Sequence, residues 1–173
     1  MRPALFCDRD GTLIVDQHYP KDPSRVALLP GVPEALRELQ TAGFLLVLVS
    51  NQSGVARGLL TRAEAAAVHT EFGRQLSVYG VCLDACYYCF HGPADACACR
   101  KPQPGMLLQA AHEHPIALSK SWMVGDKHSD MQAAYSAGVM RLAFGPHAGI
   151  SDASASCWRE IPPKLLFAAA EAR

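Results

Sequence analysis

The chain has 173 residues, half of them hydrophobic, and its 16 basic side chains balance 16 acidic ones. This length suits one domain with a full core, so we expect residues 1–173 to form a single domain. Without net charge the chain has no long-range field to attract nucleic acid or an anionic membrane surface. No apolar run approaches the roughly 20 residues that a membrane-spanning helix needs.

Strands and helices are predicted to alternate along the sequence. Residues 44–49 are all apolar, which is typical of a parallel strand covered on both faces. Thr61 and Glu64 have the spacing of a capping box, which predicts the start of a helix. The other strands are predicted at 4–7, 85–89, 122–124 and 140–144, and the helices at 33–41, 61–78, 105–113, 131–137 and 164–172. This alternation predicts an α/β fold with a doubly wound parallel sheet.

The start of the chain and its cysteines indicate the compartment. Residues 4–7 are a short apolar run followed at once by a charged loop, whereas a secretory signal needs a longer run, so we expect a cytoplasmic protein. The seven cysteines are an odd number, and three of them lie in one short loop with a histidine. This arrangement favours a metal site over a disulfide framework.

Polar side chains gather where the predicted strands end. They are Asp8 and Asp10 after the first strand, Ser50 and Asn51 after the second, Lys101 on the loop after the third, and Asp126 after the fourth. Ligands of open parallel sheets bind beyond the carboxyl ends of the strands. We therefore expect these side chains to share one site.

This set of side chains meets the demands of phosphoryl transfer. Neighbouring carboxylates repel unless a divalent cation neutralises them, and oxygen ligands suit Mg²⁺. With the cation bound, Asp8 can stay ionised and attack phosphorus, while Asp10 protonates the departing oxygen and later takes a proton from water. Ser50 and Lys101 can hold the phosphoryl oxygens. A simple turn would explain residues 8–12 alone, since Asp and Gly favour turns, but it leaves the other clusters unexplained.

A second cluster combines three cysteines and one histidine. Cys89, His91, Cys97 and Cys99 lie within eleven positions. Three thiolates and one imidazole fill a tetrahedral Zn²⁺ site with no open position, which is the structural pattern. We therefore predict a zinc-binding loop over residues 89–105 that positions Lys101, and a reactive or incidental cysteine cluster is the alternative.

The strand-end clusters resemble the motifs of the haloacid dehalogenase superfamily of phosphatases. Residues 8–12 are similar to its first motif, 50–52 to its second, Lys101 to its third and 125–130 to its fourth. The resemblance implies a Rossmann-like sheet, catalytic Mg²⁺ and an aspartyl-phosphate intermediate on Asp8. No insertion is long enough for a large cap domain over the site, so the zinc loop is the main addition expected.

Within the superfamily, residues 50–58, 89–99 and 100–106 resemble the heptose 1,7-bisphosphate 7-phosphatases, which serve the pathway to the lipopolysaccharide-core heptose. This resemblance implies a small phosphorylated sugar as substrate and hydrolysis of its 7-phosphate. The spacer at 92–96 is short, as in the related histidinol-phosphate phosphatases, and histidinol phosphate is therefore the alternative substrate.

The same resemblance implies which residues form the site. It assigns Mg²⁺ to Asp8, to Asp126 and to Asp10 through its backbone carbonyl, and Zn²⁺ to the cysteine and histidine cluster. The implied substrate contacts are Asp16, Gln17, His18, Tyr19, Ser50, Asn51, Gln52, Ser53, Arg100, Lys101 and Lys127. Arg100 and Lys127 supply cations beyond the one needed for the reacting phosphate.

Two other classes of protein share some of these features. A phospho-accepting receiver domain also combines acidic residues, a hydroxyl and a lysine on a parallel sheet, but it has no need of Asp10. A zinc-bearing interaction or nucleic-acid module would lack a reason for Asp8 and Lys101, and the neutral charge counts against it. We expect a monomer, because no association helix is evident.

Overall fold

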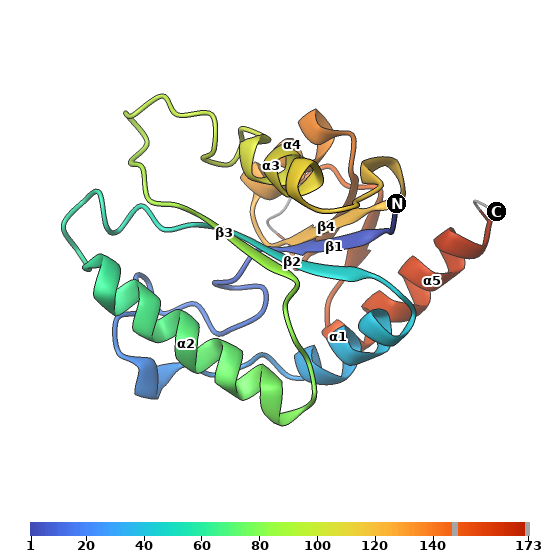
Figure 1. Cartoon of the computed structure of the whole chain (residues 1–173), viewed down its shortest axis with the longest axis horizontal. Coiled ribbons are helices and arrows are strands. Elements are labelled where there is room, and N and C mark those ends of the chain that lie inside the picture. Colours follow the sequence, from blue (N-terminus) through green and yellow to red (C-terminus); the bar gives the residue numbers. More distant parts are fainter. Residues whose placement is uncertain (147–148, 172–173) are drawn as a thin grey trace.

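The computed structural model describes residues 1–146 and 149–171. The strands of this part of the chain form one parallel sheet in the order β3-β2-β1-β4-β5-β6 (Figure 1). Their bounds are β1 (Ala4–Cys7), β2 (Leu45–Asn51), β3 (Ala85–Cys89), β4 (Trp122–Gly125), β5 (Met140–Phe144) and β6 (Ala153–Ala155). The strand order reverses at β1, so the loops after β1 and β4 meet at one point of the sheet, where ligands of such folds bind.

Helices cover both faces of the sheet (Figure 1). One face carries α1 (Val32–Thr41), α2 (Arg62–Val78) and α5 (Ile161–Glu171), and the other carries α3 (Gly105–Glu113) and α4 (His128–Ala137). Alternate residues of β1 enter the two cores: Leu5 packs among residues of α1, α2 and α5, and Phe6 among residues of α3 and α4. Burial on both faces explains the continuous apolar strands. The predicted doubly wound α/β fold is confirmed.

Short elements complete the connections. They are the 3₁₀ turns η1 (Pro23–Arg25), η2 (Leu118–Lys120) and η3 (Trp158–Glu160). The connection after β1 is a loop that includes η1, and the connection after β3 is a loop. The helices described here are all too short or too polar to span a bilayer.

Most predicted boundaries agree with the structure, and the differences have local causes. The fourth predicted helix begins at His128 rather than at 131, because the Asp130 carboxylate accepts a hydrogen bond from the Lys127 backbone N–H (3.0 Å) and caps an earlier turn. The last helix begins at Ile161 rather than at 164, because a first turn tolerates prolines. Its predicted final residue, Ala172, lies outside the described residues. Strand β6 was not predicted, because its three residues are too few to show a hydrophobic pattern.

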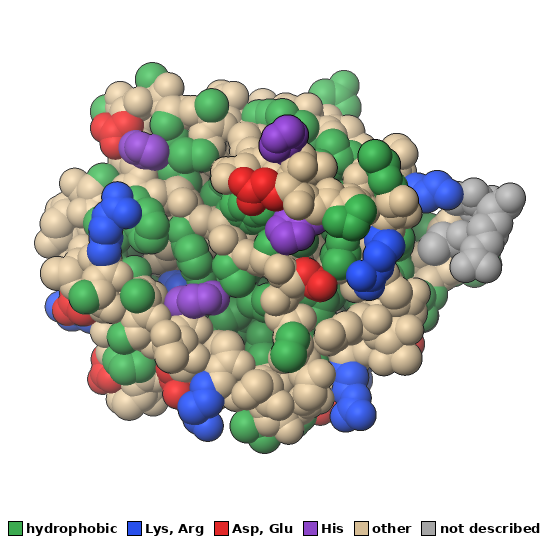
Figure 2. Space-filling view, in the orientation of Figure 1, with side chains coloured by type: hydrophobic (Ala, Val, Ile, Leu, Met, Phe, Trp, Pro, Cys, Tyr) green, Lys and Arg blue, Asp and Glu red, His purple; other side chains and the backbone are tan. Residues whose placement is uncertain are grey.

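The surface charges are dispersed on the face shown in Figure 2. Lysine and arginine side chains lie singly there, between acidic, neutral and apolar ones, and do not gather into one basic patch. This distribution agrees with the balanced charge of the sequence.

Candidate active site

The pairing of β1 with β4 places Asp8 beside Asp126. Cys7 pairs with Val124, and the next residue, Asp8, donates its backbone N–H to the Val124 carbonyl oxygen (3.0 Å). The loop after β1 then passes close to Asp126 at Gly11, which has φ +85°. A Cβ at Gly11 would lie 2.5 Å from the Asp126 Oδ2 atom, so only glycine fits this approach. Two carboxylates far apart in sequence thus lie at one edge of the sheet.

Lys101 is buried beneath this edge and is fully engaged. Its ammonium group lies 2.8 Å from Asp8 Oδ1, 2.8 Å from the Val49 carbonyl oxygen and 2.7 Å from Asp130 Oδ1. Burial opposes its charge, but the carboxylates of Asp130 and Asp8 outweigh burial and raise the pKa of Lys101. The lysine is therefore a permanent cation next to the predicted nucleophile.

The Asp10 carboxylate is held by a separate set of donors. The Arg9 guanidinium donates to both carboxylate oxygens, Nε to Oδ1 (3.2 Å) and Nη2 to Oδ2 (3.0 Å). Gln52 adds a bond from Nε2 to Oδ2 (2.8 Å). The carboxylate keeps a small exposed area and lines a pocket, so a molecule bound there can reach it.

The end of β2 ties these groups together. Asn51 holds the backbone of Lys101 with both ends of its amide, donating to the carbonyl oxygen (2.9 Å) and accepting from the N–H (3.1 Å). Gln52 donates to the hydroxyl of Ser50 (2.9 Å) as well as to Asp10. These amides therefore hold site residues in position, in addition to lining the pocket.

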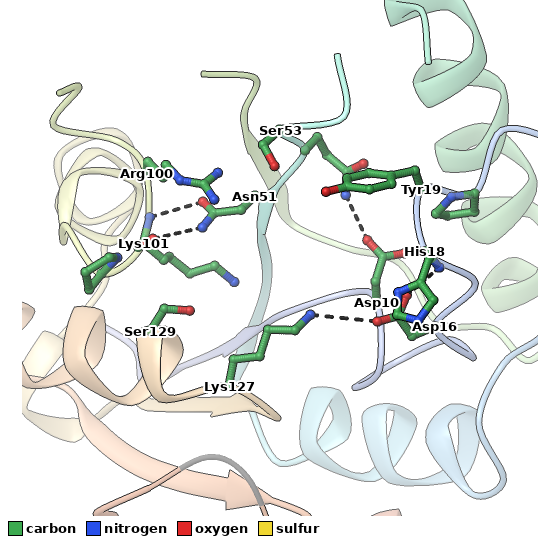
Figure 3. Close-up of a pocket in the computed structure, with 13 residues that line it drawn as sticks. Asp10, Asp16, His18, Tyr19, Asn51, Ser53, Arg100, Lys101, Lys127 and Ser129 are labelled. Carbon is green, nitrogen blue, oxygen red and sulfur yellow. Dashed lines mark hydrogen bonds and ion pairs between the residues drawn. The ribbon is translucent and has the colours of Figure 1, made fainter. Parts of the chain in front are cut away.

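A pocket of about 550 Å³ opens above these side chains (Figure 3). Asp10 and the basic residues Lys101, Arg100 and Lys127 contribute to its lining, and Asp16 lies 4.0 Å from the Lys127 ammonium. Its lining residues are Asp10, Asp16, His18, Tyr19, Pro20, Asn51, Gln52, Ser53, Arg100, Lys101, Pro102, Lys127 and Ser129. Of the predicted substrate contacts with no catalytic role, Gln17 alone is outside this lining, and its amide instead donates to the Arg25 carbonyl oxygen (2.6 Å).

The carboxylates beneath the pocket suit a hard divalent cation. Asp8, Asp126 and Asp130 each offer an oxygen, and these atoms lie within 4.8 Å of one another. Burial raises the pKa of Asp126, Lys127 opposes this rise, and the charge of Asp8 adds to it. A bound cation would remove that penalty, and an oxygen-only ligand set matches Mg²⁺. The residues thus fit the predicted metal.

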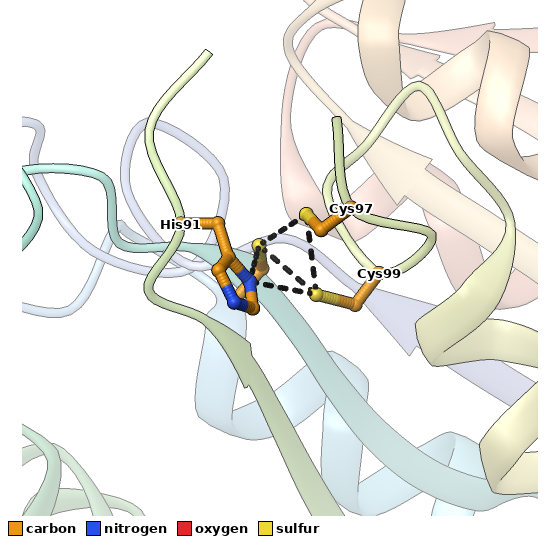
Figure 4. A group of neighbouring side chains, drawn as sticks. His91, Cys97 and Cys99 are labelled. Carbon is orange, nitrogen blue, oxygen red and sulfur yellow. Dashed lines mark hydrogen bonds between the residues drawn. The ribbon is translucent and has the colours of Figure 1, made fainter. Parts of the chain in front are cut away.

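The cysteine and histidine cluster also closes as predicted (Figure 4). Its sulfur atoms lie 3.2–3.7 Å apart, and His91 Nδ1 lies 3.3 Å from Cys99 and 3.6 Å from Cys89. Thiolates bound to one tetrahedral zinc would be separated by about 3.7 Å. Burial, followed by the hydrogen bond shared with Cys99, raises the pKa of Cys89 to about 12, so a cation is needed to hold it as thiolate. The donor set therefore fits structural Zn²⁺.

Sequence reasoning missed three residues at the site. Asp130 shares Lys101 with Asp8, Arg9 holds Asp10, and Ser129 lines the pocket. Asp130 and Ser129 were within the stretch assigned to the fourth motif, which was a usable signal. Arg9 was within the stretch assigned to the first motif, but its burial had no signal, because its neighbours are charged.

Comparison with known proteins agrees with this geometry. A family model described as HAD-hydrolase-like matches residues 98–145. A D-glycero-beta-D-manno-heptose-1,7-bisphosphate 7-phosphatase of Yersinia pestis is 46% identical over 144 residues, which cover 79% of this chain and 77% of the relative. The protein of that name from Helicobacter pylori is 43% identical, with 79% of each chain covered.

A solved structure resembles the whole fold. The D,D-heptose 1,7-bisphosphate phosphatase of B. bronchiseptica, complexed with magnesium and phosphate, superimposes with a TM-score of 0.88 at 33% identity. The match covers 96% of this chain and 99% of that structure.

The fold and the site together define a phosphatase of the haloacid dehalogenase type, a phosphoric monoester hydrolase. The identities above extend over most of the chain and most of each relative. The chain belongs to the family of D-glycero-beta-D-manno-heptose-1,7-bisphosphate 7-phosphatases.

Proposed function

We propose that this chain hydrolyses the 7-phosphate of D-glycero-D-manno-heptose 1,7-bisphosphate through an aspartyl-phosphate on Asp8. The names of the relatives at 43–46% identity support this substrate. The observation that carries the chemistry is the pair of aspartates after β1: Asp8 against a buried lysine, and Asp10 two residues on, facing the pocket. Histidinol phosphate, the alternative substrate, is not favoured by these relatives.

In the first proposed step, a carboxylate oxygen of Asp8 attacks the phosphorus atom of the 7-phosphate. The bond from phosphorus to the sugar oxygen breaks, and Asp10 gives its proton to that oxygen. Side-chain hydrogen bonds to Asp8 in the described residues fall on Oδ1, which leaves Oδ2 for the attack. Lys101 and the Ser50 hydroxyl compensate charge on the phosphoryl oxygens.

In the second proposed step, water attacks the phosphorus of the aspartyl-phosphate. Asp10, now a carboxylate, takes the proton of that water, and Asp8 leaves with the electron pair of the broken bond. Asp8, Asp126 and the Asp10 backbone carbonyl would hold Mg²⁺, which supplies charge neutralisation between the carboxylates and the phosphate when bound. Asp130 joins the same cluster and keeps Lys101 in place.

The pocket lining supports a small bisphosphorylated sugar. Its volume of about 550 Å³ is within the usual range for small-molecule sites, roughly 300–1,000 Å³. Arg100 and Lys127 can bind the phosphate that does not react, and Asp16 can accept hydrogen bonds from sugar hydroxyls. His18, Tyr19 and Ser53 would form the remaining wall. Gln17 would contribute only by supporting this loop.

The protein is proposed to act in the cytoplasm as a monomer, with neither nucleic acid nor a membrane as partner. The described cysteines are all free, and Cys82 and Cys157 are exposed. Exposed free thiols and a thiolate metal site are typical of a reducing compartment.

A phosphate-release assay with Mg²⁺ tests the proposed substrate. The heptose 1,7-bisphosphate and histidinol phosphate are compared side by side, and phosphorus NMR identifies which phosphate leaves. We expect a kcat/KM preference for the heptose of about a hundredfold or more, which corresponds to about 2.7 kcal/mol. Preference for histidinol phosphate, or release of the 1-phosphate, would contradict the proposal.

A further inference from the structure

Arg9 is a charged side chain with no exposed surface, and it contacts the Asp10 carboxylate. Burying a guanidinium costs several kcal/mol unless it is paired and hydrogen-bonded. Its partner is Asp10, which it meets through two separate N–H groups at 3.2 and 3.0 Å. A planar fork of this kind fixes the rotation of a carboxylate as well as its position.

Arg9 is held in turn by the end of strand β3. Its guanidinium carbon lies 5.9 Å from the centre of the Tyr88 ring, and the Tyr88 hydroxyl is 2.6 Å from His69 Nδ1 on α2. Tyr88 also stacks on Phe90, over which Arg62 lies at 4.6 Å. The guanidinium therefore has a rigid aromatic support on the side of the sheet that carries α2.

The same stretch of chain holds the zinc ligands. Tyr88 and Phe90 alternate with Cys89 and His91, so the aromatic side chains and the proposed zinc ligands leave the backbone alternately. Gln52, whose backbone N–H donates to the Cys89 carbonyl oxygen (2.7 Å), adds the remaining bond to Asp10. Arg9 and Gln52, which orient the Asp10 carboxylate, thus both depend on contacts with the end of β3.

We propose that Arg9 is a positioning residue for the reaction: it orients the Asp10 carboxyl group toward the oxygen of the leaving sugar, and Tyr88 keeps Arg9 in place. The proposal rests on the function proposed above, in which Asp10 transfers protons in both steps. Arg9 itself touches neither the substrate nor the phosphoryl group, since it has no exposed surface.

The test compares two leaving groups in Arg9→Met. An alkoxide leaving from the heptose needs the Asp10 proton, whereas nitrophenolate leaving from p-nitrophenyl phosphate does not. We expect single-turnover formation of the aspartyl-phosphate from the heptose bisphosphate to slow by about 100-fold or more. The first-turnover burst of nitrophenolate should stay within about threefold of the unaltered chain. Its steady-state rate should fall, because water attack still needs Asp10.

The matched control is Arg74→Met, which removes an exposed arginine that also makes two bonds to a carboxylate, that of Glu71. We expect this variant to keep both rates. Equal slowing of both first turnovers in Arg9→Met would indicate a merely structural role and overturn the proposal. Unchanged rates with both substrates would overturn it as well.

Two further measurements separate folding and substrate from the proposal. If Arg9→Met does not fold, as judged by zinc content and thermal unfolding, Arg9→Lys is compared in the same way, because it keeps the charge and loses the fork. If the unaltered chain ignores the heptose but hydrolyses another alkyl phosphate, the proposed substrate is wrong. The Arg9 comparison then uses that ester, with the same two outcomes deciding it.

Discussion

The carboxylate cluster and the cysteine cluster differ in ligand chemistry and in surroundings. Asp8, Asp126 and Asp130 offer hard oxygen atoms below a pocket that a substrate can enter. The cysteine and histidine cluster offers four soft or borderline atoms that fill a tetrahedron among themselves. Mg²⁺ keeps open positions for phosphate and water, whereas zinc with four protein ligands keeps none. The difference indicates chemistry at the first cluster and support at the second.

The two clusters are nevertheless connected through Lys101. The loop that carries the proposed zinc ligands leads directly to this lysine. Asn51 holds the Lys101 backbone through two hydrogen bonds, and Asn51 itself pairs with Cys89 in the sheet. A disturbance of the cysteine cluster should therefore reach the active site through stability. A disturbance of the carboxylates should change the reaction without unfolding the chain.

The largest effect is expected from Asp8→Asn. An amide cannot form the aspartyl-phosphate, so turnover should fall on the order of 10⁴-fold or more, equivalent to about 5.5 kcal/mol. The variant should stay folded, since Asn keeps the shape and can still accept the Lys101 hydrogen bond. Phosphate release and thermal unfolding, measured on the same sample, check both parts. Substantial residual activity would remove Asp8 as the nucleophile.

Cys97→Ala should reduce stability first and activity only as a consequence, the reverse of Asp8→Asn. Loss of one ligand should release zinc and lower the free energy of unfolding by on the order of 4 kcal/mol, with activity falling because Lys101 loosens. Metal content and urea unfolding give the two measurements. Cys157→Ala is the control, since Cys157 is an exposed thiol outside the cluster. A Cys97→Ala variant that is stable and active without zinc would refute the structural role.

The smallest expected effect is on the pH dependence of stability, and it comes from Cys86, a thiol outside the proposed zinc cluster. Burial raises the pKa of Cys86 from 9.0 to about 11. Below pH 9 the thiol is protonated in both states; between pH 9 and 11 only the unfolded state ionises, so stability falls as pH rises. Because the side chain is partly exposed, the expected loss is about 1 kcal/mol. Urea unfolding from pH 8 to 10.5 should show a steeper decline in the unaltered chain than in Cys86→Ala. Parallel declines would contradict the assignment.

Much of this arrangement was predictable because it depends on local pattern. Continuous apolar runs identified buried parallel strands, and the position of Asp8 and Asp126 after such strands predicted that they meet. The four proposed zinc ligands lie in one short stretch, so their spacing alone was informative. Strand β6 was less predictable because three residues are too few to show a hydrophobic pattern. The start of α5 was less predictable because two prolines lie in its first turn.

The sequence by itself determined the layered fold, the chemical type of both clusters and the order of the strand-end groups. The tertiary structure decided which groups are paired: Lys101 with Asp130 as well as Asp8, and Arg9 with Asp10 over the Tyr88 ring. It also turned Gln17 out of the pocket lining. The contacts of Lys101 with Asp8 and of Arg9 with Tyr88 join residues distant in the chain, and they follow from burial and strand register, which local sequence does not encode.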